Sequence, residues 1–291
     1  MSYLIIAVAI WASAFIFGKF SYEMFDPALT VQLRLLIGLL FCLPTFMSAY
    51  RQIPAHLRTR VWLLAWINFP VVLLLQFIGL SFTSAASAVT MLGTEPLIVA
   101  FIGHFFFKQS AKLLDWILGV LAFIGIALVV IGGETTGDVS LWGCLLVLAG
   151  SAAFGFTIYL GRDVLKECDA KAFTNVILVL GAVLCLPFTA VLVRDWTVHF
   201  SWLGVASILY LGIGCTWLAY RLWNKGLLST RPVAVSIINT LEPVFGVMLA
   251  VSFLGEELTF VTGLGMVLVI GAASASVLLP TLRAHFRKRQ L

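Results

Sequence analysis

The sequence predicts an all-α integral membrane protein in which ten transmembrane helices form two inverted five-helix repeats. Of its 291 residues, 62% are hydrophobic and only 11% are charged, and the mean hydropathy is +1.09. Soluble domains carry roughly 25% charged residues, far more than this chain. Apolar runs of about 20 residues, long enough to cross a bilayer core of about 30 Å as a helix, recur along the whole chain. The two halves of the chain also resemble each other in sequence.

Ten apolar runs are the expected membrane spans. We place them at residues 2–20, 29–49, 61–81, 87–107, 112–132, 140–161, 171–192, 202–224, 232–254 and 258–279. The first run contains Ala12-Ser13-Ala14, which imitates a signal-peptide cleavage site, but no basic residue precedes it. We therefore expect the first span to be retained.

Lysine and arginine are distributed unevenly between the predicted loops, and cytoplasmic loops carry the excess of such residues. With a cytoplasmic N-terminus, the cytoplasmic segments hold fourteen of the 18 basic residues: Arg51, Arg58, Arg60, Lys108, Lys112, Arg162, Lys166, Lys171, Lys225, Arg231, Arg283, Arg287, Lys288 and Arg289. The opposite loops are mainly acidic. The charge pattern predicts a multi-pass protein with both termini in the cytoplasm.

Charge, cysteine content and motifs argue against several function classes. The net charge of +5 and the basic end "RAHFRKRQ" suit attraction to anionic lipid, so we expect no nucleic-acid partner. The five cysteines match neither a disulfide framework nor a zinc pattern, and we expect no metal and no cofactor. The sequence holds no P-loop, no H-E-x-x-H motif and no nucleophile elbow, which argues against direct use of ATP and against an enzyme.

The chain repeats itself at a spacing close to half its length. "VTMLGTEPLIVAFIGHFF" (89–106) aligns with "SIINTLEPVFGVMLAVSF" (236–253), and "FCLP" (41–44) aligns with "LCLP" (184–187). Gly18-Lys19 similarly aligns with Gly161-Arg162. These matches predict a first five-helix repeat over residues 1–137, a second over 138–282, and a basic cytoplasmic tail over 283–291. Because five is odd, the second repeat enters the membrane in the opposite orientation, an arrangement characteristic of transporters that work by alternating access.

Further stretches follow one another in an order and spacing typical of one family. They are "WASAFIFGK" (11–19), "QLRLLIGLL" (32–40), "GLSFTSAASAV" (79–89), the two Glu-Pro segments and "LGEELT" (254–259). Together they resemble the EamA-type ten-helix exporters of the drug/metabolite transporter superfamily, over nearly the whole chain. The first repeat departs from the pattern at "FFKQSA" (106–111), a loop that lacks the Gly-Glu of the second repeat. The resemblance implies an exporter whose first and sixth helices line a central cavity.

Each half places a Glu-Pro pair near the centre of a span: Glu95-Pro96 in the fourth and Glu242-Pro243 in the ninth. Proline removes a helical hydrogen bond and disfavours helical geometry at the preceding residue, so we expect both helices to break there. An ionised acid at the bilayer centre costs roughly 2.5 to 3.5 kcal/mol, similar to the about 3.7 kcal/mol needed to protonate a glutamate at pH 7. Two roles stay open: shaping a kink, or binding a proton or the cargo.

Polar and aromatic residues inside the spans complete the set of candidate binding residues. The set is Trp11, Phe15, Asn68, Gln76, Glu95, Tyr159, Trp217, Tyr220, Asn239 and Glu242, with Pro96 and Pro243 as helix breaks. The amides equally suit hydrogen bonds between helices, and Trp or Tyr near span ends also forms interfacial belts. Lys19 and Arg34 are expected to extend to the interface, with an anion-attracting vestibule as the alternative. Small residues in the fifth and tenth spans suit scaffolding or subunit contact, so a homodimer stays open.

The leading hypothesis is a secondary transporter of the bacterial inner membrane. It exports a small metabolite, an amino acid or related compound, with protons as a candidate coupling ion. Efflux of drugs or other cationic compounds is the alternative within the same fold, because acidic groups in an aromatic cavity suit hydrophobic cations. A zwitterion also needs a cation or a helix N-terminus for its carboxylate. A membrane protein with a structural or sensory role is the alternative of another class.

Overall fold

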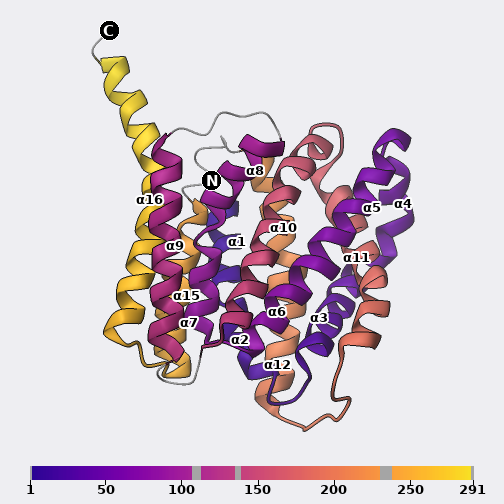
Figure 1. Cartoon of the computed structure of the whole chain (residues 1–291). Coiled ribbons are helices and arrows are strands. Elements are labelled where there is room, and N and C mark those ends of the chain that lie inside the picture. Colours follow the sequence, from indigo (N-terminus) through magenta and orange to yellow (C-terminus); the bar gives the residue numbers. More distant parts are fainter. Residues whose placement is uncertain (1, 107–112, 135–138, 230–237, 290–291) are drawn as a thin grey trace.

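A computed structural model of the chain describes residues 2–106, 113–134, 139–229 and 238–289, and every regular element within these ranges is helical (Figure 1). The first half contains α1 (Ser2–Ala12), α2 (Ala14–Ser21), α3 (Pro27–Cys42), η1 (Leu43–Thr45), α4 (Phe46–Gln52), η2 (Ala55–Leu57), α5 (Arg58–Trp66), η3 (Ile67–Leu73), α6 (Leu74–Ser81), α7 (Ala85–Leu92), α8 (Glu95–Phe106) and α9 (Leu113–Glu134). The second half contains α10 (Leu141–Leu165), α11 (Ala170–Leu192), α12 (Trp202–Tyr210), η4 (Leu211–Leu218), α13 (Ala219–Ser229), α15 (Leu241–Leu254) and α16 (Phe260–Arg289).

These helices account for the ten predicted spans. Eight segments are long and apolar enough to cross a membrane, and Leu241–Leu254 and Phe260–Ser276 are shorter apolar helices. The predicted start of the ninth span, at residue 232, lies outside the described residues. Large apolar side chains stay exposed, such as Phe123 (73%) and Phe260 (86%), as suits contact with lipid. The prediction of an all-α membrane protein is therefore confirmed.

The helices pair as expected for two related halves. α1 packs against α13, and its counterpart α10 packs against α6, the counterpart of α13. The remaining pairs join equivalent spans directly: α3 with α11, α7 with α15 and α9 with α16. α1 and α10 run in opposite directions in Figure 1, as inverted halves require. Both the third and the eighth span also widen into a π-helical stretch, η3 and η4.

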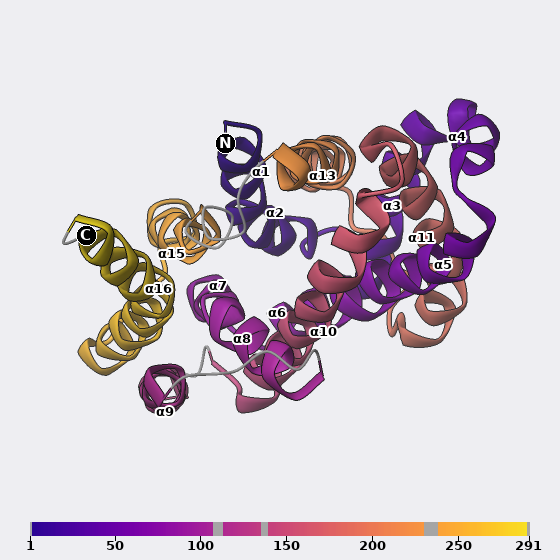
Figure 2. The same ribbon diagram turned by 90° about the horizontal axis from the view of Figure 1, so that it is seen from above.

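α9 and α16 meet through glycines at one side of the bundle, away from α4, α5 and α11 (Figure 2). A Cβ atom on Gly125 would lie 2.8 Å from the carbonyl oxygen of Gly265, and one on Gly265 would lie 2.6 Å from the carbonyl oxygen of Gly125. The small residues of these spans therefore serve a close contact within the chain. The homodimer stays a prediction.

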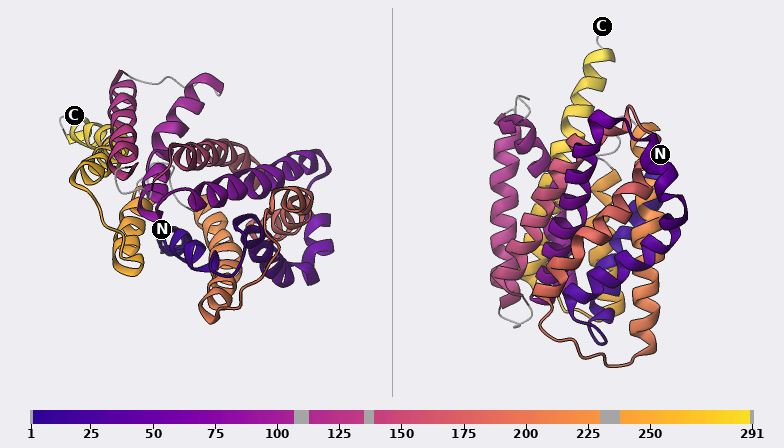
Figure 3. Two further views of the ribbon diagram at one scale, coloured as in Figure 1. Left: turned by 60° about the horizontal axis from the view of Figure 1, so that its bottom comes forward. Right: turned by 90° about the vertical axis from the view of Figure 1, so that its right-hand side faces the viewer.

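The two ends of the bundle differ. At the end away from the termini, the Glu256 carboxylate, in the α15–α16 connection, accepts hydrogen bonds from the backbone N–H groups of Ala85 and Ala86 at 2.6 and 2.9 Å. This contact joins the second half to the first turn of α7. At the other end, α16 continues to Arg289, so residues 283–289 of the predicted tail prolong the last helix beyond the bundle (Figure 3).

Candidate functional site

The interruption of the fourth span falls before its proline. α7 and α8 are separated by Gly93 and Thr94, and α8 begins at Glu95. In the ninth span, α15 begins one residue before Glu242, after Thr240. Both prolines therefore occupy the first turn of a helix, where the missing N–H removes no hydrogen bond. This differs from the expectation that the glutamates lose helical geometry: both are helical, and the chain turns upstream of them.

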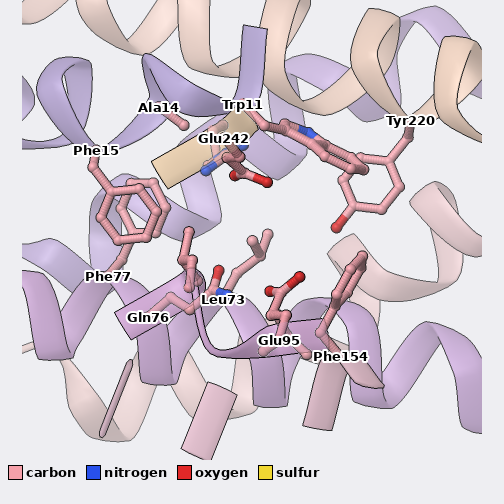
Figure 4. A pocket seen from close by; sticks show the side chains of 13 residues that line it. Trp11, Ala14, Phe15, Leu73, Gln76, Phe77, Glu95, Phe154, Tyr220 and Glu242 are labelled. Carbon is pink, nitrogen blue, oxygen red and sulfur yellow. The ribbon is translucent and has the colours of Figure 1, made fainter. Parts of the chain in front are cut away.

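Both glutamates face one cavity between the two halves (Figure 4). Its wall is formed by Trp11, Ala14, Phe15, Arg34, Val72, Leu73, Gln76, Phe77, Leu92, Glu95, Phe154, Tyr220 and Glu242. Glu95 is 7% exposed and Glu242 is 9% exposed. In Figure 4 the two side chains enter from opposite walls, and the Tyr220 hydroxyl points into the same space. Neither carboxylate belongs to an ion pair among the described residues.

Aromatic rings make up much of the remaining wall and are held in place by one another. Trp11 donates its indole N–H to the carbonyl oxygen of Cys215 at 2.9 Å. Its ring meets Tyr220 edge-on, with the ring centroids 5.1 Å apart. Phe15 stacks on Phe77 at 6.0 Å. Such contacts fix the rings at little cost in entropy, so the cavity has a rigid aromatic surface.

Arg34 is the cavity residue whose placement corrects the sequence analysis. It does not extend to the interface: it is 2% exposed, and its Nε donates to the Thr216 hydroxyl at 2.8 Å. The guanidinium lies over the Phe77 ring, 4.8 Å from the centroid. α3 begins at Pro27, so Arg34 lies about 10 Å along the helix at 1.5 Å per residue, too deep to reach the helix end. Lys19 lines a different cavity, together with Glu256 and Glu257.

The cavity brings together six of the ten predicted binding residues: Trp11, Phe15, Gln76, Glu95, Tyr220 and Glu242. The sequence analysis missed Arg34, Phe77 and Phe154. Phe154 had a signal, because the register that aligns Gly18 with Gly161 also aligns Trp11 with Phe154. Within the described residues, no group of three His, Cys, Asp or Glu side chains is placed to hold a metal ion.

The other four candidates lie outside this wall. Asn68 donates to the carbonyl oxygen of Leu64 and accepts from the Thr157 hydroxyl at 3.2 Å, which links η3 to α10. The Tyr159 hydroxyl donates to the carbonyl oxygen of Val99. Trp217 packs on Phe41, with the centroids 5.0 Å apart. The Asn239 side-chain oxygen is buried and finds no hydrogen-bond partner within the described part of the chain.

A second cavity is lined in part by repeat counterparts of the residues that line the first. Phe154 and Tyr220 belong to both walls. The register of "FCLP" and "LCLP" aligns Arg34 in the first wall with Ile177 in the second. The duplication has therefore produced two cavities that share a boundary and differ in charge.

Comparison with known proteins assigns the chain to a family. The model of the EamA-like transporter family matches residues 1–131 and 141–278. The chain belongs to this family. An uncharacterized transporter of Archaeoglobus fulgidus is 27% identical to this EamA-like transporter over 290 residues, 97% of each chain. An uncharacterized transporter of Haemophilus influenzae is 43% identical over 143 residues, 48% of this chain and 84% of the relative.

Two further comparisons concern cargo and fold. An S-adenosylmethionine/S-adenosylhomocysteine transporter of Chlamydia muridarum is 27% identical over 267 residues, 85% of this chain and 82% of the relative. A solved crystal structure superposes with a TM-score of 0.66 at 18% identity and covers 97% of both chains, which shows a shared fold. The family and these relatives indicate a membrane transporter for a small molecule rather than an enzyme.

Proposed function

We propose that this EamA-like transporter exports a small amino compound, an amino acid or a close relative, across the bacterial inner membrane by alternating access. One observation carries the proposal: Glu95 and Glu242, from equivalent positions in the two halves, share one aromatic-lined cavity between those halves. Carboxylates attract the ammonium group of such a cargo, and aromatic faces stabilise it further. S-adenosylmethionine, named for one relative, is itself an amino-acid derivative.

Proton exchange follows from the same two side chains. Two ionised carboxylates in one buried cavity are unfavourable unless a cation or a proton neutralises them. A cargo ammonium and a proton therefore compete for the same acids, and this competition allows a proton entering the cell to replace a cargo molecule leaving it. The pH gradient then drives export.

The direct test uses purified protein in liposomes loaded with mixed amino acids, with flux measured by exchange of a labelled apolar amino acid. We expect Glu95→Gln and Glu242→Gln to lower flux by more than about tenfold, since a charge-assisted hydrogen bond contributes roughly 1.5 to 3 kcal/mol. The matched control is Glu167→Gln, an exposed acid paired with His56. Full flux with unchanged pH dependence in both cavity variants would show that the glutamates are structural.

Orientation is tested with single cysteines. All five native cysteines are buried, so background labelling by an impermeant thiol reagent is low. Cysteine at His56 and at Asp195 places probes in exposed loops of opposite predicted sidedness. We expect intact cells to label the Asp195 position and only permeabilised cells to label the His56 position. The reverse pattern would overturn the assignment of cytoplasmic termini.

Efflux of hydrophobic cations is the second candidate, favoured by the acids and the aromatic wall. The same liposomes decide between them: flux of tetraphenylphosphonium without flux of any amino acid would favour cation efflux. A structural or sensory protein would move neither.

A further inference from the structure

Arg34 is a buried cation in the cavity wall with an unfilled hydrogen-bonding position. Its Nη1 atom is buried and has no hydrogen-bond partner among the residues that the structure describes. Its Nε is occupied by Thr216, which in turn donates its hydroxyl proton to the carbonyl oxygen of Leu211. The Phe77 face packs against the guanidinium. Residues of η4 and α6 therefore hold the Arg34 guanidinium in place, and its Nη1 remains available to a ligand.

No acid neutralises this charge among the described residues. The ion pairs found there, with a limit of 4.0 Å, do not include Arg34. A buried charge without a partner is unfavourable, so each such group in a native structure needs an explanation, and a bound ligand of opposite charge is one. A guanidinium presents parallel N–H groups that match the two oxygens of a carboxylate.

The fold does not require a cation at this position. The register that aligns "FCLP" with "LCLP" also aligns Gly38 with Gly181 and Arg34 with Ile177. Ile177 is buried in α11 and lines the second cavity. The same place in the same kind of helix thus accepts an apolar side chain. In contrast, the glutamates occur in both halves, so the acids are symmetric and the arginine is not.

We infer that Arg34 binds the carboxylate of the transported compound while Glu95 and Glu242 hold its ammonium group, so that the cavity selects zwitterionic amino acids over simple amines. The inference rests on the proposed function. Arg34 and the two acids line one cavity yet lie beyond ion-pair distance of each other, which leaves room for a molecule carrying both charges between them. Phe15 and Phe77 beside Arg34 favour an apolar side chain.

The test compares each cargo with its own uncharged-carboxyl analogue. Liposomes containing the wild type are given labelled leucine, methionine or phenylalanine and, in parallel, the corresponding amino-acid amides. We expect the wild type to move the acids at least tenfold faster than the amides. Arg34→Gln should slow the amino acids and leave amide flux unchanged, so that the two rates differ by no more than about threefold. Arg34→Lys should give a ratio of amino-acid to amide flux between those of the wild type and Arg34→Gln.

Controls separate recognition from folding. Arg221→Gln removes a second-half arginine whose guanidinium lies over the Trp217 ring and which is outside the cavity wall, and it should leave the ratio of acid to amide flux unchanged. Thr216→Val keeps the charge but frees Nε, and it should lower the ratio partially. If Arg34→Gln does not fold, the ratio is measured on Arg34→Lys and Thr216→Val instead.

Failure of the inference and failure of the proposed function give different results. Wild-type acid-to-amide ratios in all Arg34 and Thr216 variants, with flux still lost in the glutamate variants, would make Arg34 structural and leave the proposed function standing. A wild type that moves amides or simple amines in preference to acids would overturn the inference and favour cation efflux. A wild type that moves neither would overturn both.

Discussion

Two contacts join equivalent spans of the two halves, the fifth with the tenth and the fourth with the ninth, and the helices that form them differ in structure. α9 and α16 are continuous helices that touch backbone to backbone at Gly125 and Gly265. The fourth span is broken into α7 and α8, and it meets α15 beside the cavity that holds both glutamates. The first pair is in close backbone contact, whereas the second borders the cavity that holds both carboxylates. The close contact between continuous helices is therefore separate from the interrupted span that carries charged side chains into the cavity.

The largest loss of stability is expected at the contact between α9 and α16. Gly265→Ala places a Cβ 2.6 Å from the carbonyl oxygen of Gly125 and 2.7 Å from the backbone nitrogen of Val129. Because backbone atoms cannot move aside, we expect a loss of about 3 kcal/mol in the free energy of unfolding. Thermal unfolding in detergent measures it. The control is Gly271→Ala on the same helix, where an added Cβ meets no described atom within 4 Å. Equal stability of the two variants would contradict a close backbone contact at Gly265.

A smaller loss is expected where α15 meets α7. A Cβ on Gly246 would overlap Cγ1 of Val89. Since a side chain can yield partly, Gly246→Ala should cost about 2 kcal/mol. The double variant with Val89→Ala should recover at least half of this loss, because the obstructing methyl group is gone. A loss in the double variant equal to the sum of the single losses would contradict this contact.

Trp11→Phe tests the cavity wall. It removes the hydrogen bond to Cys215 and should lower stability by about 1 kcal/mol. Amino-acid flux should fall more than stability alone accounts for, since the ring lines the cavity. Unfolding and flux measured on one preparation separate the effects, with Trp142→Phe, which is exposed at the start of α10, as control. Unchanged flux would place Trp11 among the scaffold residues.

The smallest effect is expected at the proline itself. Pro243→Ala lies in the first turn of α15, where no hydrogen bond depends on it, so the stability change should stay below about 1 kcal/mol. Flux should persist for the same reason. Collapse of either quantity would show that proline, rather than the turn before it, maintains the break.

Duplication made part of this site predictable from sequence. Glu95 and Glu242 are predictable because both halves keep a Glu-Pro pair at the same position, and the alignment of the two halves makes such a pair visible. The sequence places Arg34 at the interface, with an anion-attracting vestibule as the alternative, because a charge near the start of an apolar run is typical of an interfacial residue. Only the packing of α3 on η4 shows that Arg34 lies inside. The π-helical stretches η3 and η4 were not predicted, since their hydrogen-bond register leaves no mark in composition. The turn at Gly93 and Thr94 was overlooked because the neighbouring proline offered a stronger signal.

The two hydrogen bonds from Glu256 to the start of α7 have a consequence for the proposed alternating access. They tie the halves together at the end of the bundle away from the termini. Hydrogen bonds to a charged group contribute roughly 1.5 to 3 kcal/mol each, while conformations that interconvert at equilibrium differ by only a few kcal/mol. Under the proposed alternating access, opening at that end would break both hydrogen bonds, whose contribution is as large as the whole free-energy difference between the states. We therefore expect the Glu256 carboxylate to favour molecules that are closed at that end.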